Sequence, residues 1–201
     1  TKGFLRREQY AISLALIVDG RIAVGALCCP SYPLQDGRRR GIVCIAEQDE
    51  GAWETSLDRD GECASLRVRP AADQRAIRVC ESVEAAHSSH GDSARIAQAL
   101  DIGAPPVRMD SQAKYAAVAR GDADAYLRLP KGPDYREKIW DHAGGVIAVT
   151  EAGGRVTDIH GRPLDFSVGR SLQKNRGVVV TSGAFHEAFI DAIAALGIGR
   201  F

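Results

Sequence analysis

The sequence predicts an α+β fold, in which an antiparallel β-sheet is followed by an α/β layer. Within residues 1–70, apolar residues alternate with small or polar ones, and turn residues recur at hairpin spacing. After Pro70, short apolar runs alternate with segments that carry helix-capping residues. The chain has 201 residues, 45% of them hydrophobic, which is enough to bury a core. We therefore predict two domains: residues 1–70, whose hairpins complete an N-terminal antiparallel sheet, and residues 71–201, a C-terminal α/β domain.

Residues 10–28 predict the first β-hairpin. Apolar residues alternate on both sides of Asp19-Gly20, a pair typical of tight hairpin turns: Ile12, Leu14, Leu16 and Val18 before it, and Ile22, Val24 and Ala26 after it. We expect Pro30 and Pro33 to end the second strand, because proline donates no hydrogen bond to a sheet. Residues 42–46 and 53–57 predict a second hairpin, with its turn at residues 49–51.

Strands and helices are expected to alternate in the second domain. Asp92 or Ser93 is suited to cap one helix, and Gly121 is suited to end another. The expected strands are residues 76–81, 107–109, 125–129 and 178–180, and the expected helices are residues 92–100, 112–120, 141–152 and 184–196.

Charge and cysteine content indicate a small-molecule ligand and a reducing compartment. Lysine and arginine together number 26, as do aspartate and glutamate, so no excess of positive charge favours nucleic acid. The apolar stretches are shorter than the roughly 20 residues of a membrane-spanning helix. The five cysteines form no CxxC pair, which is typical of free thiols in the cytoplasm. The sequence leaves the oligomeric state open.

Ser111 and Lys114 are candidate anion-binding residues. Ser111 falls where a predicted strand meets a predicted helix, and free backbone N–H groups at a helix start favour an anion. Lys114 lies one turn further on and can add a point charge to a phosphate. The alternative is an ordinary helix cap followed by a solvated lysine.

Asp141 is a candidate ligand for a hard cation such as Mg²⁺. It stands at the start of a predicted helix and is followed by small residues, which leave room for a ligand. The alternative is an ordinary capping aspartate whose neighbouring glycines allow close helix packing. His142, His160 and His186 look solitary, so we expect surface or structurally satisfied histidines.

Several motifs in order resemble one family of phosphatases. Residues 140–154 (WDHAGGVIAVTEAGG) resemble the C-terminal signature of the inositol monophosphatase superfamily. Four further segments are similar to the 3′(2′),5′-bisphosphate nucleotidases within it: residues 82–90, 109–115 (MDSQAKY), 126–130 and 135–140. The resemblance covers essentially the whole chain.

The resemblance implies a layered α+β sandwich and a Mg²⁺-dependent phosphomonoesterase. Its substrate would be adenosine 3′,5′-bisphosphate, which loses its 3′-phosphate to give AMP. By the same resemblance, Thr1 would contact the substrate and help to orient the attacking water. Asp141 would bind the metal. The nucleotide would be lined by His87, Ser111, Lys114 and Arg128.

The family's other metal-binding and catalytic carboxylates would precede Thr1. The chain as given is therefore expected to be a C-terminal part of the enzyme. Because multi-metal phosphoryl chemistry needs several carboxylates, we expect this part to be inactive alone. We also expect one face of its first hairpin to be uncovered. Two alternatives stay open: an inositol or sugar phosphate phosphatase of the same superfamily, and a non-catalytic nucleotide-binding module. Residues 87–90 (HSSH) and 110–115 argue against the first.

Overall fold

The first sheet is built from consecutive hairpins and is antiparallel throughout, with its strands in chain order. The computed structural model describes residues 2–34, 37, 40–58, 63–83 and 90–200. The strands are β1 (Ile12–Val18), β2 (Arg21–Pro33), β3 (Arg40–Glu47), β4 (Gly51–Ser56) and β5 (Ala64–Ser65). Both predicted hairpins are confirmed, and Asp19 and Gly20 form the first turn with the positive φ angles that such turns require.

The prediction that Pro30 ends the second strand is wrong, because β2 continues to Pro33. The pairing of β2 with β1 stops at Cys28, and its pairing with β3 becomes irregular between Cys29 and Pro33. A proline is tolerated there because the ladder does not need its missing N–H group.

The second sheet has the order β7-β6-β8-β10-β9 and is mixed. Strand β6 (Val79–Glu81) pairs in parallel with β7 (Val107–Arg108) and with β8 (Ala125–Arg128). Strand β10 (Val178–Thr181) pairs antiparallel with β8 and β9 (Arg155–Thr157). The carboxyl ends of β7, β6 and β8 therefore meet at one edge of this sheet.

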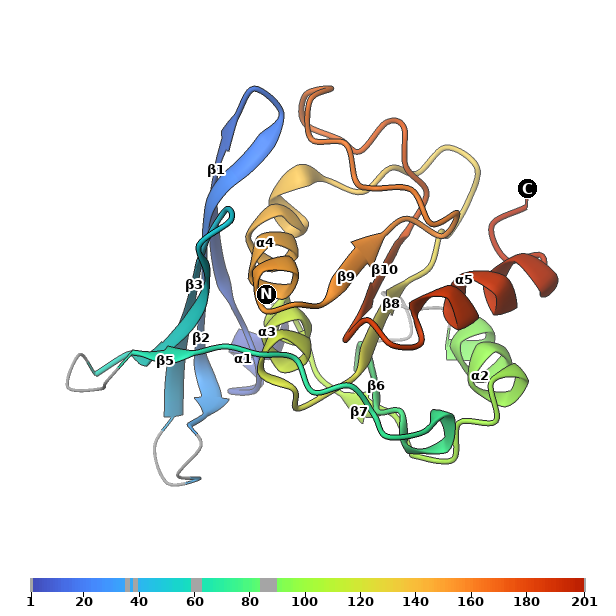
Figure 1. Ribbon diagram of the computed structural model, residues 1–201, viewed down its shortest axis with the longest axis horizontal. Helices are drawn as coiled ribbons and strands as arrows, with labels where there is room; N and C mark the ends of the chain where they lie inside the picture. Colours follow the sequence, from blue (N-terminus) through green and yellow to red (C-terminus); the bar gives the residue numbers. More distant parts are fainter. Residues whose placement is uncertain (1, 35–36, 38–39, 59–62, 84–89, 201) are drawn as a thin grey trace.

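Helices separate the two sheets and cover the second one (Figure 1). Helices α3 (Ala113–Arg120) and α4 (Ala143–Glu151) lie between the sheets, whereas α2 (His90–Ala99) and α5 (His186–Ala195) lie on the far side of the second sheet. The layers thus alternate as sheet, helices, sheet and helices, which is the predicted fold class. Gly121 ends α3 in the left-handed conformation, as expected.

Several predicted boundaries are displaced, and short elements were not foreseen. The expected strand 76–81 holds only β6, because its first residue belongs to the 3-10 helix η1 (Gln74–Ala76), which Asp73 caps. The helix expected from Asp92 or Ser93 begins at His90. The helix expected from Asp141 begins at Ala143, after the 3-10 turn η3 (Ile139–Asp141). Helix α1 (Lys2–Leu5), β5 and β9 were not predicted.

Glycines let α4 approach its neighbours closely. A Cβ atom on Gly145 would collide with the Tyr115 ring of α3, and one on Gly25 of β2 would collide with Ile147 of α4. The glycine-rich start of α4 thus serves close packing. One core cluster joins side chains of both sheets, including Leu27 and Val180. The division into domains at residue 70 therefore stays a prediction.

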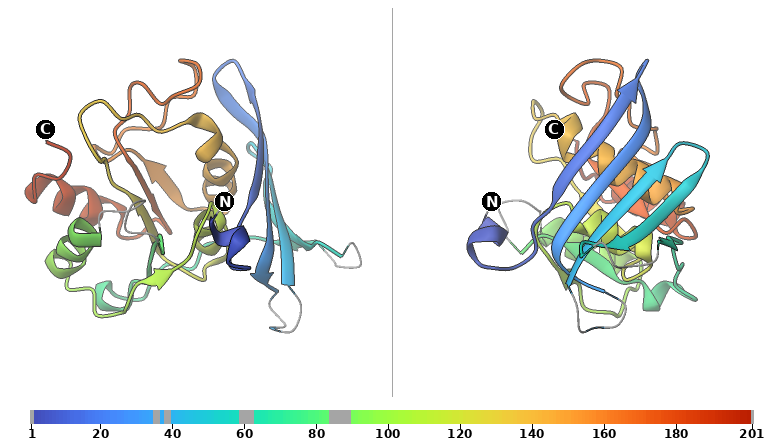
Figure 2. Two further views of the ribbon diagram at one scale, coloured as in Figure 1. Left: turned by 180° about the vertical axis from the view of Figure 1, so that it is seen from behind. Right: turned by 90° about the vertical axis from the view of Figure 1, so that its left-hand side faces the viewer.

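The outer face of the first sheet carries exposed apolar side chains. Ile12, Leu14, Leu16 and Val18 of β1 are 57%, 68%, 56% and 50% exposed, and β1 is the edge strand. Figure 2 shows α3 and α4 on the inner side of this long hairpin, so neither helix covers its outer side. The expectation that these residues lack cover is thus met among the described residues. The cause that we expected for it, missing upstream segments, stays a prediction.

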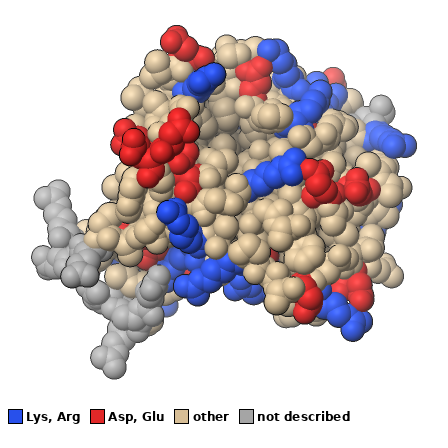
Figure 3. Space-filling model, in the orientation of Figure 1, with Lys and Arg blue, Asp and Glu red and all other residues tan. Residues whose placement is uncertain are grey.

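Charged side chains are intermixed on the surface. The face in Figure 3 carries lysine and arginine as well as aspartate and glutamate, in small groups of either sign. Among the described residues, no helix is long and apolar enough to cross a membrane.

Candidate active site

A pocket of about 530 Å³ opens at the carboxyl ends of the three parallel strands. Residues that follow parallel strands meet at one edge of the sheet, where α/β folds bind ligands. The pocket brings together four of the six predicted site residues. It is lined by Gly3, Ser82, Asp110, Ser111, Gln112, Lys114, Tyr126, Arg128, Lys131, Tyr135, Glu137, Asp141 and His142.

Ser111 occupies a strained turn between β7 and α3. Its φ angle is 64°, in the left-handed region that favours glycine. Its hydroxyl oxygen accepts a hydrogen bond of 3.2 Å from the backbone N–H of Ala113. A serine that keeps this conformation in a pocket wall is typical of a functional turn, because strain persists where the surrounding structure imposes it.

Lys114 is buried in the pocket wall, so the alternative of a solvated lysine is wrong. Its side chain donates hydrogen bonds to the carbonyl oxygens of Met109 at 3.1 Å and Ser111 at 2.9 Å. Its Nζ lies 5.1 Å from the centre of the Tyr126 ring. Burial lowers the pKa of Lys114 to about 8. The residue therefore supplies a positive charge that is costly to bury and that an anion would stabilise.

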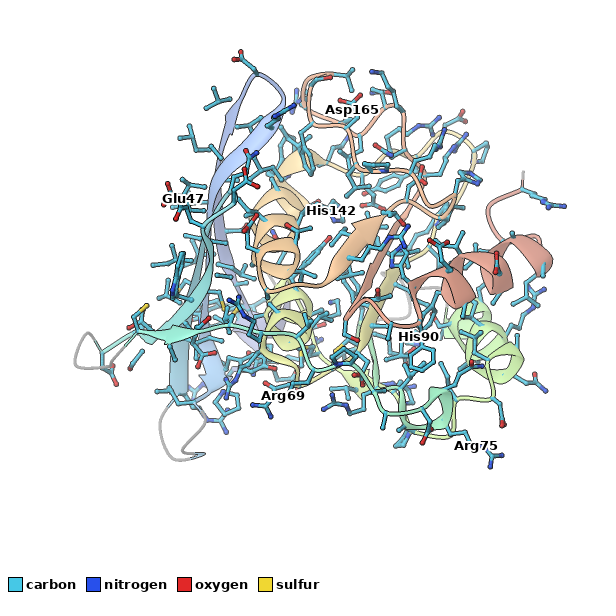
Figure 4. The ribbon with its side chains drawn as sticks, viewed as in Figure 1. Glu47, Arg69, Arg75, His90, His142 and Asp165 are labelled. Atoms are coloured by element: carbon cyan, nitrogen blue, oxygen red, sulfur yellow. The ribbon has the colours of Figure 1, made fainter. Side chains whose placement is uncertain are left out.

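Arg128 enters the pocket from the end of β8, and its guanidinium is held by a carboxylate. Nε donates a hydrogen bond of 3.1 Å to Oε1 of Glu137, which is 5% exposed. The other carboxylate oxygen lies 3.2 Å from Nε2 of His142. Figure 4 shows His142 beside α4, on the side that faces the second sheet. Burial would raise the pKa of Glu137, but His142 and Arg128 lower it below its ordinary value.

Asp141 lies in the turn η3 at the pocket wall and is exposed. It provides one oxygen ligand of the kind that Mg²⁺ prefers. Among the described residues, no three His, Cys, Asp or Glu side chains converge to hold a metal ion. These residues therefore fit one carboxylate ligand of a Mg²⁺ ion and do not by themselves complete a site.

The start of the chain reaches the same pocket. Gly3 of α1 lines it, and Arg6 forms an ion pair with Asp110, the residue before Ser111. This pair joins segments 104 residues apart in the chain. The other two predicted site residues, Thr1 and His87, lie outside the described residues.

The pocket also contains ionisable residues that were not among the predicted site residues, among them Glu137, His142 and Lys131. Glu137 and His142 lie inside motifs that suggested the family, but sequence alone does not show that they pair with each other. Lys131 follows β8 by three residues and also lines the pocket. His186, expected to be satisfied, is buried between the hydroxyls of Thr157 and Thr181, each at 2.8 Å.

The fold and the pocket together define a class of protein. A pocket that holds Lys114 and Arg128 at the carboxyl ends of parallel strands, beside an exposed carboxylate, is suited to bind a phosphate ester. The profile of the inositol monophosphatase family matches residues 1–197. The chain belongs to this family.

Two curated proteins of similar sequence share one name. The chain is 46% identical over 209 residues to a 3′(2′),5′-bisphosphate nucleotidase of Emericella nidulans, covering 96% of this chain and 59% of that protein. It is 45% identical over 201 residues to a protein of the same name from Schizosaccharomyces pombe, covering 98% of this chain and 57% of that protein. The chain thus spans less than two thirds of the length of these relatives.

Solved structures share the fold. The inositol monophosphatase of Anabaena superimposes with a TM-score of 0.69 at 20% sequence identity, covering 97% of this chain and 68% of that chain. The SuhB protein of Mycobacterium tuberculosis gives a TM-score of 0.68, also at 20% identity, covering 96% of this chain and 68% of that chain. These likenesses confirm the predicted inositol-monophosphatase-like layered sandwich.

Proposed function

We propose that the whole protein carrying this chain is a Mg²⁺-dependent phosphomonoesterase that removes the 3′-phosphate of adenosine 3′,5′-bisphosphate. Water attacks the phosphorus, the bond between phosphorus and the 3′-oxygen breaks, and that oxygen takes up a proton, giving AMP and phosphate. The main support for the proposal is that Ser111, Lys114, Arg128 and Asp141 line one pocket. The names of relatives at 45% and 46% identity support the substrate.

In this proposal the pocket residues bind and orient the two phosphates. Lys114 contributes a point charge, Arg128 a planar fork of N–H donors, and Ser111 a hydroxyl donor. Asp141 would hold Mg²⁺, which when bound neutralises the charge that develops on the transferred phosphate. Thr1 would also contact the substrate and orient the attacking water, and His87 would contact the nucleotide.

Phosphate release from two substrates tests the proposal. The whole protein, supplied with Mg²⁺, is expected to hydrolyse adenosine 3′,5′-bisphosphate much faster than inositol monophosphate. Faster hydrolysis of inositol monophosphate would instead identify an inositol phosphate phosphatase. Binding of the nucleotide without hydrolysis would identify a non-catalytic nucleotide-binding module.

A cytoplasmic location forms part of the same proposal. All five cysteines are free thiols, and Cys29, Cys44 and Cys80 are buried. Free thiols persist in reducing compartments. Fractionation of cells that express the whole protein tests this location.

A further inference from the structure

A chain of hydrogen bonds between largely buried side chains lies in the pocket wall. It links the guanidinium of Arg128 to the Glu137 carboxylate, that carboxylate to His142, and Nδ1 of His142 to the Tyr115 hydroxyl at 2.6 Å. Glu137, His142 and Tyr115 are 5%, 2% and 1% exposed. The chain connects β8, the segment before α4, and α3.

The hydrogen atoms in this chain can be assigned from the donors and acceptors. A carboxylate only accepts, so Nε2 of His142 carries the hydrogen that it donates to Glu137. Burial raises the pKa of Tyr115 well above its ordinary value, so the phenol keeps its hydrogen and donates it to Nδ1. Each oxygen of Glu137 thus has a fixed donor, and the carboxylate has little freedom to turn.

A glutamine at position 137 would change both contacts. Its amide oxygen could still accept from Arg128, but its NH₂ group would then face Nε2 of His142, which could accept only in the other tautomer, with Nδ1–H donating to the Tyr115 oxygen. Glutamine also carries no negative charge, so its bond to the guanidinium would lose the charge assistance that the carboxylate gives. The Arg128 guanidinium is thus tied through its Nε to a charged acceptor that has little freedom to turn, and such charge-assisted hydrogen bonds are stronger than neutral ones.

We propose that Glu137 is a positioning residue that holds the Arg128 guanidinium in the orientation in which it binds a phosphate of the substrate. The role rests on the proposed function, because it presumes that Arg128 contacts the nucleotide. Glu137 acts through Arg128, and His142 and Tyr115 keep its carboxylate in place. The competing explanation is that Glu137 serves folding alone.

A double-mutant cycle in the whole protein separates these explanations. Calorimetry measures the dissociation constant of adenosine 3′,5′-bisphosphate without divalent metal for wild type, Glu137→Gln, Arg128→Met and the double variant. We expect Glu137→Gln to weaken binding roughly tenfold, and to weaken it no further when Arg128 is already replaced, because coupled residues are not additive. With Mg²⁺ present, KM is expected to change more than kcat.

A matched control accounts for lost stability. Thr181 lies in β10, in the same sheet as Arg128 but away from the pocket, and contacts the buried His186. Thr181→Ala removes this contact, so it should lower Tm without changing the dissociation constant. If Glu137→Gln does not fold, Tyr115→Phe, which removes one hydroxyl from the chain, is expected to weaken binding by a smaller factor, and an unchanged dissociation constant would overturn the role.

The outcomes also separate this role from the proposed function. Wild-type protein that does not bind the nucleotide would overturn both. Wild-type protein that binds it, but in which the effects of Glu137→Gln and Arg128→Met multiply, would overturn the role of Glu137 alone.

Discussion

The ammonium group of Lys114 donates a hydrogen bond of 2.9 Å to the carbonyl oxygen of Ser111, one turn earlier in the chain. With the second bond to Met109, this contact fixes the lysine on the wall of the pocket. The same turn therefore presents a hydroxyl and a cation side by side. Because burial lowers the pKa of Lys114 to about 8, the charge at this position changes within an accessible pH range.

We expect the affinity for adenosine 3′,5′-bisphosphate to fall as the pH rises above about 8, because Lys114 then loses its charge. Calorimetry without divalent metal should show a dissociation constant about tenfold higher at pH 9.5 than at pH 7. Cys80, Asp110 and Arg128 also influence Lys114. Burial raises the pKa of Cys80 to about 12, so this thiol stays protonated throughout.

The Lys114→Arg variant is the control for this pH dependence. Its guanidinium stays charged over the whole range, so its dissociation constant should stay nearly constant. An equal rise in wild type and in this variant would assign the pH dependence to another group.

Ser111→Gly and Ser111→Ala should differ in their free energy of unfolding but have similar affinities for the nucleotide. Gly adopts the left-handed φ of 64° without strain, so Ser111→Gly should have a free energy of unfolding about 1 kcal/mol higher than Ser111→Ala. Both variants lose the hydroxyl and should bind the nucleotide more weakly than wild type. Urea unfolding and calorimetry measure the two effects. Wild-type affinity in both variants would remove Ser111 from the site.

Asp141→Asn in the whole protein should remove almost all activity without unfolding the protein. The side chain is exposed, and neither η3 nor α4 uses it as a cap, so Tm should change little. Loss of one carboxylate should weaken Mg²⁺ binding and reduce phosphate release by about a hundredfold. Near-normal turnover at low Mg²⁺ would exclude Asp141 as a metal ligand.

The 201-residue chain expressed alone should self-associate and release no phosphate. Its edge strand β1 exposes Leu14 and Leu16 among other apolar side chains, and exposed apolar edges promote association. Sedimentation should show oligomers of the wild-type chain. The double variant Leu14→Lys, Leu16→Lys should shift them toward monomer. The control Val83→Lys changes an exposed position outside the first sheet and should leave the oligomers unchanged. A monodisperse, active wild-type monomer would contradict this prediction.

The sequence predicts those parts of the fold that local chemistry determines. Asp19-Gly20 specifies its turn because few residues tolerate positive φ, and Gly121 ends α3 for the same reason. The short strands β5 (Ala64–Ser65) and β9 (Arg155–Thr157) were missed because neither contains a run of large apolar residues. Their extended form depends on the strand that pairs with them.

The candidate site was predictable to the extent that motifs mark it. Ser111 and Lys114 combine a helix start with a cation, a signal that is visible in sequence. Glu137 was not predicted as a site residue because its role depends on contacts with two partners. These are Arg128, nine residues before it, and His142, five residues after it. Neither spacing belongs to a regular element, so only the folded loop brings these groups together.

If Lys114 and Arg128 bind the phosphates of the nucleotide, their replacement should change the KM of the whole protein for adenosine 3′,5′-bisphosphate. Lys114→Ala and Arg128→Ala should each raise KM about tenfold or more and change kcat less, because each removes a charged hydrogen-bond donor. Lys174→Ala and Arg75→Ala, which break exposed ion pairs outside the pocket, should leave KM unchanged. Wild-type KM in both pocket variants would contradict the assignment of this pocket.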